Sequence, residues 1–345
     1  MKKWMMAAAG LALLTAPGLA RADSISPTSF SATLGVGDST TVHKTVTVSA
    51  GSAATQADIF FLSDTTGSMG GTIAGVQSAA SSILTATAGL GNIAWGVGQY
   101  KDGDFASPPA TTVSYNLDQN ITTTQSSIST ALGTWSAGGG GDTPEQALHA
   151  LTEVANTTAW RAGSQKVVVW FGDASAHDPG TGGETLASTI AALNVQGVKV
   201  IAFDVGALDA AGQATAITTA TGGSYHVGLA DPATDVVNAI TAAFATYSSV
   251  CLDTSSAPAG VSASSTPCVT GAFDRSVERT FDFDLTFTGN TPGVYSFPTF
   301  GTVDGGIVAT EDDAITVGAV PEPATLAVLG LGVVGFGFVR RRRAA

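Results

Sequence analysis

The sequence predicts an α/β protein whose central part is a doubly wound, mostly parallel sheet flanked by β-strand segments. Nearly continuous apolar runs occur at 57–64, 92–100, 165–173 and 198–206, with short strand candidates at 111–115 and 224–228. Such runs are typical of strands that are buried on both faces of a sheet. Segments compatible with helices alternate with them, at 72–88, 122–135, 144–158, 184–195 and 233–247. This alternation predicts a parallel sheet of the doubly wound type.

The flanking segments have a different pattern. Residues 29–50 alternate apolar and polar side chains around a Gly-Val-Gly-Asp-Ser turn, which predicts a hairpin. Residues 278–289, 293–300 and 307–317 alternate in the same way. We expect the two flanks together to form a β-sandwich that carries the α/β domain as an insertion. A separate C-terminal β-domain with a loose N-terminal arm is the alternative.

Both ends of the chain have the features of targeting signals. The chain starts with Lys2 and Lys3, continues with an apolar stretch, and reaches a small-residue cleavage site at 20–22. These elements predict a signal peptide and a mature chain that begins at Asp23. The predicted organisation is a signal peptide at 1–22, an N-terminal β segment at 23–56, an α/β domain at 57–250, a C-terminal β segment at 251–318 and a sorting signal at 319–345.

The last segment combines three features. A Val-Pro-Glu-Pro motif at 320–323 precedes an apolar run at 324–339 and four arginines at 340–343. The run is shorter than the roughly 20 residues of a full membrane span, and the arginines favour the cytoplasmic side. The segment resembles the PEP-CTERM sorting signal. That resemblance implies a Gram-negative bacterium, transient inner-membrane anchoring through the C-terminal helix, processing by an exosortase, and delivery to the cell surface or extracellular matrix. A plain C-terminal anchor is the alternative.

Composition limits the classes of partner. Hydrophobic residues make up 44% of the chain and charged residues 12%, so the chain can bury a core. Between 23 and 319 it has seven basic and 26 acidic residues, a net charge of −19. This charge disfavours nucleic acid and anionic lipid, and it favours divalent cations.

The two cysteines, Cys251 and Cys268, lie close in sequence. In an exported protein such a pair predicts a disulfide. Two free thiols or a two-cysteine metal site are the alternatives.

Acids and hydroxyls occur in three loops of the predicted α/β domain. They are Asp64, Thr66 and Ser68 in the first loop, Asp142, Thr143 and Glu145 in the second, and Asp173 in the third. In an open parallel sheet, ligands bind beyond the carboxyl ends of the strands. Carboxylate and hydroxyl oxygens suit Mg²⁺ or Mn²⁺. Each loop alone also fits helix capping, but the three together predict a divalent-cation site.

This set resembles the metal-ion-dependent adhesion site of von Willebrand factor A (vWA) domains, and more narrowly that of the I-like domain of integrin β subunits. The resemblance covers residues 58–247. The ligands that it implies for Mg²⁺ or Mn²⁺ are Asp64, Thr66, Ser68, Glu145 and Asp173, with Thr143 as the alternative ligand from the second loop. It also implies that the bound cation takes a carboxylate from a protein or polysaccharide partner. The insertion of an I-like domain into a β-domain is a further feature of integrin β subunits.

The integrin pattern implies an adjacent cation site, which would take Ca²⁺. The matching positions are Asp102, Asp142, the carbonyl of Pro144, and Glu145. Gly140 stands where the family has an asparagine, which departs from the pattern. A third integrin site needs two acids after the first loop, and Gly70, Gly71 and Thr72 occupy that stretch instead.

The function that we expect is adhesion through a bound cation, and we expect no enzymatic activity. The chain contains four histidines, and it has no His-Glu-x-x-His, Gly-x-Ser-x-Gly or phosphate-binding lysine motif. Only His177, four residues after Asp173, is a candidate general base near the site. A passive structural protein of an exopolysaccharide matrix is the alternative function, and a metal-dependent hydrolase is a further one.

Overall fold

The structure is a computed structural model that describes residues 23–51, 56–107 and 111–319. The predicted signal peptide and the predicted sorting signal from residue 320 onward lie outside these residues. In the part of the chain that is described, no helix combines the length and apolar character needed to cross a membrane.

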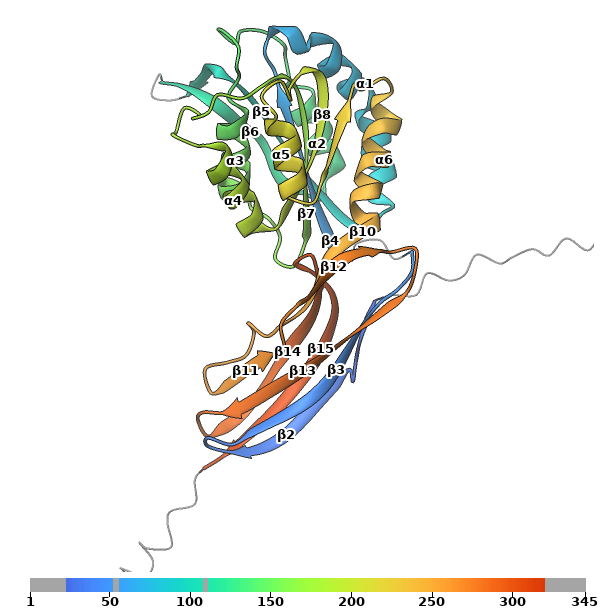
Figure 1. Cartoon of the computed structure of the whole chain (residues 1–345), viewed down its shortest axis with the longest axis vertical. Helices are drawn as coiled ribbons and strands as arrows, with labels where there is room; N and C mark the ends of the chain where they lie inside the picture. Colours follow the sequence, from blue (N-terminus) through green and yellow to red (C-terminus); the bar gives the residue numbers. More distant parts are fainter. Residues whose placement is uncertain (1–22, 52–55, 108–110, 320–345) are drawn as a thin grey trace, which may run out of the picture.

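A six-stranded sheet forms the centre of the α/β domain (Figure 1). In spatial order its strands are β6 (Thr111–Thr122), β5 (Asn92–Ser107), β4 (Gln56–Asp64), β7 (Gln165–Ala174), β8 (Val198–Ala207) and β9 (Ser224–Val227). Neighbours from β5 to β9 are parallel, whereas β6 runs antiparallel to β5. The sheet is therefore mixed, with an antiparallel edge strand that the predicted mostly parallel sheet did not specify.

Helices cover both faces of this sheet. They are η1 (Gly67–Met69), α1 (Gly70–Ala88), α2 (Gln125–Leu132), α3 (Ala147–Thr157), α4 (Leu186–Gln196), α5 (Gln213–Ala220) and α6 (Pro232–Ala245). Because successive side chains of a strand point to opposite faces, Phe61 of β4 joins a core with α1, α2 and α6. Its neighbour Phe60 joins a second core with α3, α4 and α5.

The helices differ from the predictions in several places, among them α2, which covers Gln125–Leu132 of the predicted 122–135. α5 was not predicted, because its short sequence buries only two apolar side chains, Ala214 and Ile217. The last helix ends at Ala245, two residues before the predicted end, because Thr246 is extended and starts strand β10. Tyr247 then packs on Phe273 in the β-sandwich. The domain boundary predicted at residue 250 thus falls inside β10.

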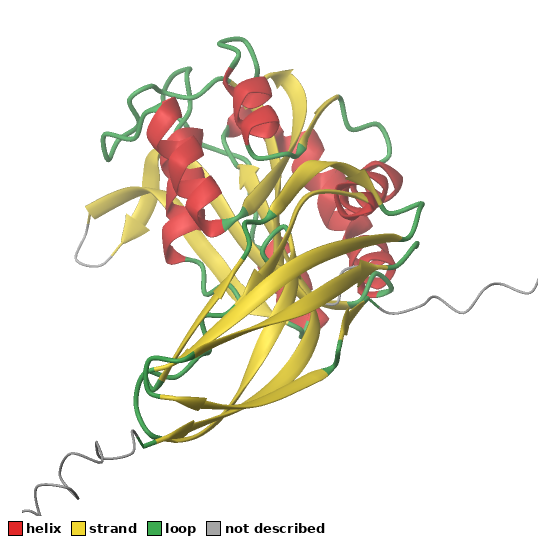
Figure 2. Cartoon of the chain, turned by 60° about the horizontal axis from the view of Figure 1, so that its bottom comes forward, coloured by secondary structure: helices red, strands yellow, loops and turns green. Residues whose placement is uncertain are grey.

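The β-sandwich (Figure 2) is made of strands from both flanks of the chain, which are blue and orange to red in Figure 1. One sheet contains, in order, β1 (Ser24–Ser26), β3 (Ser39–Val48), β13 (Arg279–Gly289) and β11 (Val261–Ser265). The other contains β12 (Val269–Asp274), β10 (Thr246–Asp253), β14 (Gly293–Val303), β15 (Gly306–Gly318) and β2 (Ser29–Gly35). β3 pairs with β13 and β2 pairs with β15, so residues from opposite ends of the sequence share both sheets.

The predicted hairpin at 29–50 is wrong. β2 and β3 follow one another in sequence, but they belong to different sheets. Leu34 of β2 and Val46 of β3 instead share the core between the sheets. Period-two alternation identifies the buried face of a strand, and it is satisfied equally by hairpin pairing and by packing across a sandwich.

The predicted disulfide is confirmed. Cys251 in β10 is bonded to Cys268, which precedes β12, with an S–S distance of 2.09 Å.

Asp304, in the turn between β14 and β15, links the sandwich to the α/β domain. Its carboxylate lies 2.7 Å from Lys199 Nζ of β8 and accepts hydrogen bonds from the backbone N–H groups of Ser248 and Ser249. The backbone N–H of Ile307 also donates to Gly163 O, 2.8 Å away. The two parts therefore meet at the end of the central sheet opposite to the loops described next (Figure 1).

Candidate functional site

The first and second predicted loops pack against each other through their backbones. Gly67 N donates to Gly139 O at 3.2 Å, and Gly138 N donates to Thr65 O at 3.1 Å. Gly140 lies between the loops with a positive φ of 84°, and a Cβ there would lie 2.5 Å from Thr66 Cγ2. The family's asparagine would collide at this position, which gives a physical reason for the glycine.

The second and third loops are also joined. Glu145 N donates to Ser175 O at 2.9 Å, and His177 N donates to Glu145 O at 2.8 Å. Glu145 and Ala176 form a short parallel bridge. This pairing holds Glu145 beside the end of β7, where Asp173 lies.

The three loops surround a hollow of about 280 Å³. Four predicted site residues line it: Ser68, Thr143, Glu145 and Asp173. Asp64 and Thr66, from the same first loop as Ser68, are buried, with 0% and 2% of their surface exposed. The structure therefore brings the predicted residues of three loops to one place.

Several buried oxygens at this place have no hydrogen-bond partner among the described residues. They are Asp64 Oδ2, Thr66 Oγ1, Glu145 Oε2, and both carboxylate oxygens of Asp102. Asp64 Oδ1, by contrast, accepts a hydrogen bond from Thr66 N at 2.8 Å. Buried polar atoms are almost always paired in folded proteins, and each unpaired one calls for an explanation. A cation at the hollow could be bound by the oxygens of Asp64, Thr66 and Glu145, and a second cation beside it by those of Asp102.

The acids of the site repel one another, and Asp64 and Glu145 are buried, with 0% and 5% of their surface exposed. Burial, together with the charges of Asp173 and Asp102, raises the pKa of Asp64 to about 7. Burial also raises the pKa of Glu145 to about 8, with additional repulsion from Asp64 and Asp102. A divalent cation favours the ionised forms and removes this cost. Hard oxygen donors of this kind fit Mg²⁺ or Mn²⁺.

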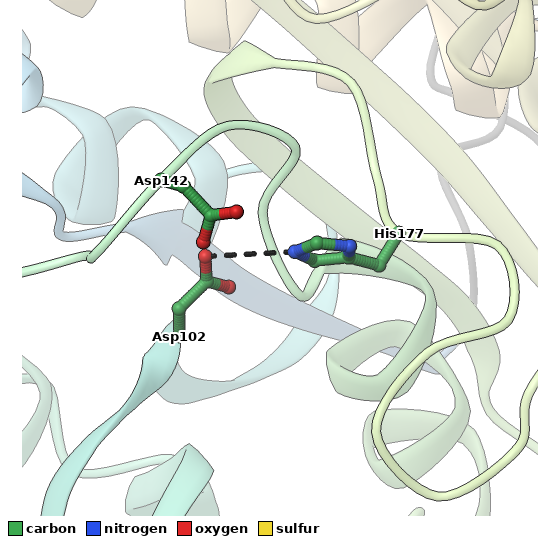
Figure 3. A group of neighbouring side chains, drawn as sticks. All are labelled: Asp102, Asp142 and His177. Atoms are coloured by element: carbon green, nitrogen blue, oxygen red, sulfur yellow. Dashed lines mark ion pairs between the residues drawn. The ribbon is translucent and has the colours of Figure 1, made fainter.

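A second group of potential ligands lies beside the hollow (Figure 3). One ligand atom from each of Asp102, Asp142 and His177 lies within 4.8 Å of the others, and His177 Nε2 is 3.7 Å from Asp102 Oδ2. Asp102 and Asp142 were predicted to share an adjacent site, but His177 was considered only as a general base. Because His177 lies in the loop that follows Asp173, the sequence could have indicated it as a further member of this adjacent site. Pro144, the remaining predicted member, is half-buried.

We expect the stability of the metal-free protein to fall as the pH rises from about 4 to about 8. Because the pKa values of Asp64 and Glu145 are raised above their ordinary values, the folded state binds more protons than the unfolded state between pH 4 and 8. The stabilisation is complete below the ordinary pKa values and is lost as the pH passes the raised ones. Urea unfolding in a chelator, with and without excess Mg²⁺, measures this effect.

The variant Asp64→Asn serves as the control for that measurement, because other buried acids also titrate. The slope of stability against pH should be smaller in the variant than in the parent. Stability that rises with pH in the metal-free parent would contradict the expectation. In the parent, Mg²⁺ affinity should increase by about tenfold per pH unit for each proton that binding displaces.

Comparisons with known proteins agree with this description at the level of the domain. A model of the von Willebrand factor A domain matches residues 58–205, and a model of the PEP-CTERM protein-sorting motif matches residues 319–343. No curated protein matches the chain. A vWA domain together with this export signal indicates a secreted or surface protein of adhesive or structural type. The PEP-CTERM motif indicates recognition by an exosortase in a Gram-negative bacterium.

Two solved structures are similar in part. Proximal thread matrix protein 1 from the mussel byssus is 16% identical over 59% of this chain and 48% of that protein, with a TM-score of 0.40. The pilus adhesin SpaC from Lactobacillus rhamnosus GG is 14% identical over 83% of this chain and 47% of that protein, with a TM-score of 0.41. The matched regions thus span about half the length of either protein.

Proposed function

We propose that this chain, which carries a vWA domain and a PEP-CTERM sorting motif, is a cell-surface or matrix adhesin that binds its partner through a divalent cation. Removal of the N-terminal signal peptide and exosortase processing of the C-terminal motif deliver it to the exterior. The partner is a protein or an acidic polysaccharide that offers a carboxylate.

The observation that carries this proposal is the group of unpartnered buried oxygens from the first and second loops. Asp64 Oδ2 and Glu145 Oε2 are buried without a hydrogen bond among the described residues, beside a hollow that Asp173 also lines. Burying carboxylates together costs free energy unless a cation compensates them. The buried, unpartnered carboxylates therefore support a bound cation at this place.

The residues that would hold Mg²⁺ or Mn²⁺ are Asp64, Thr66, Ser68, Asp173, and either Glu145 or Thr143. When bound, the ion supplies an electrophilic centre that attracts a carboxylate. Ser68 is exposed at the hollow, so a partner carboxylate can approach from that side. The buried Asp64 fixes the inner edge of the site.

The adjacent acids support the narrower integrin β-like assignment. Asp102 and Asp142 approach each other as the integrin pattern requires, and both oxygens of Asp102 are buried without a hydrogen bond among the described residues. Ca²⁺ is the cation we assign to this second position, with the oxygens of Asp102 and Asp142 as its ligands and the His177 imidazole beside them. It would hold the second loop in place and so position Glu145.

A passive matrix protein is the second candidate, in which the cation only stabilises the fold. The hydrolase alternative needs a base at the hollow. His177 is not among the residues that line the hollow, and its ring faces Asp102 and Asp142 (Figure 3).

Calorimetric titration of the purified protein with Mg²⁺, Mn²⁺ and Ca²⁺ tests the proposal. We expect saturable binding of Mg²⁺ and Mn²⁺ that is lost in Asp173→Ala, because that substitution removes one ligand without opening the core around Asp64. A folded parent that binds none of the three ions would contradict the cation site.

Adhesion needs a second measurement, in which the parent and Asp173→Ala are bound to immobilised acidic polysaccharide and to carboxylate-rich protein. We expect the parent to bind one of these surfaces in Mg²⁺ and to release it in chelator. Equal binding by the parent and the variant would favour the passive matrix protein.

A further inference from the structure

Three charged side chains are completely buried inside the β-sandwich, far from the candidate cation site. Lys44 lies on β3, in one sheet, and Glu311 and Asp313 lie on β15, in the other. All three side chains have an exposed fraction of 0%. Glu311 and Asp313 are two residues apart on one strand, so both point to the same face, toward Lys44.

The contacts within this group are close. Lys44 Nζ lies 2.5 Å from both Oε1 and Oε2 of Glu311, and 3.9 Å from Asp313 Oδ1. Asp313 Oδ2 accepts a hydrogen bond from Thr299 Oγ1 at 2.6 Å. Asp313 Oδ1 has no hydrogen-bond partner among the described residues. Thr299 thus holds one acid in place beside the Lys44–Glu311 contact.

The surroundings are aromatic and exclude water. The Phe30 ring lies 5.4 Å from Lys44 Nζ, and Phe30 and Phe297 flank Asp313 on the neighbouring strands. Phe283 is the strand partner of Lys44 and is 1% exposed. Two acids therefore share one base in a dry core, and a buried pair of opposite charges is costly there.

Burial and the neighbouring acid favour the neutral form of Glu311. Burial raises the pKa of Glu311 to about 7, and the charge of Asp313 contributes to the rise. Burial raises the pKa of Asp313 as well. A carboxyl group and an amine can condense to an amide with loss of water. When the fold holds the two groups in contact, the reaction is accelerated as if both were present at a very high concentration.

We propose that Lys44 and Glu311 form a covalent amide bond between Nζ and the side-chain carboxyl carbon, with Asp313 as the group that carries the proton. The bond is a modification of the sandwich, and it is independent of cation binding at the α/β domain.

The reaction is balanced without an oxidant or a cofactor. Glu311 starts as a neutral carboxyl group, Lys44 as an ammonium and Asp313 as a carboxylate. Asp313 accepts one proton from the ammonium, and the neutral amine attacks the carboxyl carbon of Glu311, which forms the C–N bond. Asp313 gives this proton to the departing hydroxyl group, the C–O bond breaks, and one molecule of water leaves. Asp313 then accepts the remaining extra proton from the nitrogen and ends as a neutral carboxyl group, so it acts as base, acid and base in turn.

The bond would join strands of opposite sheets whose residues are 267 positions apart in sequence. The whole α/β domain lies between the two positions, from β4 to α6. β15 leads directly to the sorting motif at 319–343. A force between the α/β domain and an anchored C-terminus must therefore cross the sandwich, where the bond would oppose separation of the two sheets.

Mass spectrometry of the purified full chain tests the proposal. After reduction of Cys251–Cys268 under denaturing conditions, we expect the intact mass to be lower than that of its sequence by one water. A tryptic digest should contain one branched peptide that joins the Lys44 and Glu311 segments. Lys44→Met should show the full mass of its own sequence. Asp313→Ala should lose water about a hundredfold more slowly during refolding.

The intact mass and the tryptic peptides of the parent protein test the proposed bond even if a variant fails to fold. A folded parent of full mass would overturn the proposal and leave only a buried ion pair. A branched peptide that joins Lys44 to Asp313 would overturn the assignment of Glu311. Circular dichroism of the parent establishes that the molecules analysed are folded.

Discussion

Asp64→Asn is expected to weaken Mg²⁺ binding by at least about a hundredfold and to raise the free energy of unfolding of the metal-free protein. The two effects have one cause. The Asp64 carboxylate is fully buried, and Asp173 and Asp102 repel it. Asparagine keeps an oxygen that can accept the hydrogen bond from Thr66 N, but it carries no charge. Calorimetry measures the binding, and urea unfolding in chelator at about pH 8 measures the stability.

Asp118→Asn is the matched control, because it removes a carboxylate of the same domain that is already well paired. Asp118 accepts hydrogen bonds from Gln99 Nε2, Asn116 Nδ2 and Trp135 Nε1. The amide NH₂ of asparagine would face these N–H groups, and two donors cannot form a hydrogen bond. We therefore expect the free energy of unfolding to fall by about 1–3 kcal/mol, with Mg²⁺ binding unchanged. If Asp64→Asn behaves in the same way as this control, Asp64 is an ordinary buried acid and not a cation ligand.

Arg161→Met is expected to lower the free energy of unfolding by about 3–5 kcal/mol. Asp58, near the start of β4, is 0% exposed, and the Arg161 side chain is its charged partner, with Nε 2.5 Å from Asp58 Oδ1. Arg161 N and Ser164 Oγ donate to the other carboxylate oxygen. The variant retains these two donors and leaves the charge of Asp58 without its cation. Urea unfolding with an unchanged m-value measures the loss.

Arg279→Met is the control for that prediction. Arg279 is exposed and lies near the Phe273 ring, so its replacement should cost at most about 1 kcal/mol. The double variant Asp58→Asn/Arg161→Met should recover part of the stability, since it removes the buried charge along with its partner. An Arg161→Met variant as stable as Arg279→Met would show that the backbone and Ser164 donors alone satisfy Asp58.

Local patterns determined the central strands and the chemistry at their ends. The continuous apolar runs of β4, β7 and β8 identify strands covered on both faces, and the match to a vWA model over 58–205 confirms the domain type. Asp64 and Asp173 could be placed at one edge because neighbouring parallel strands share their direction. Their roles as ligands stay predictions until the cation is titrated.

Only the tertiary structure decided the long-range pairings. β2 and β3 alternate in the manner of a hairpin, yet they enter different sheets, because alternation defines a buried face and leaves the partner strand open. The cluster of Asp102, Asp142 and His177 likewise depends on how three loops pack.

The buried group of Lys44, Glu311 and Asp313 shows most clearly the difference between what local sequence patterns predict and what tertiary packing decides. In the sequence, each residue belongs to an alternating strand and is in phase with the apolar side chains of that strand, as Lys44 is with Val46 and Asp313 with Ile315. The two sheets place these polar positions on their inner faces, where water is excluded and the charges meet. Sequence alone therefore determined the types of element and the candidate cation ligands, which depend on neighbouring residues. The fold decided which distant residues share a dry environment, because that depends on the packing of segments 267 positions apart.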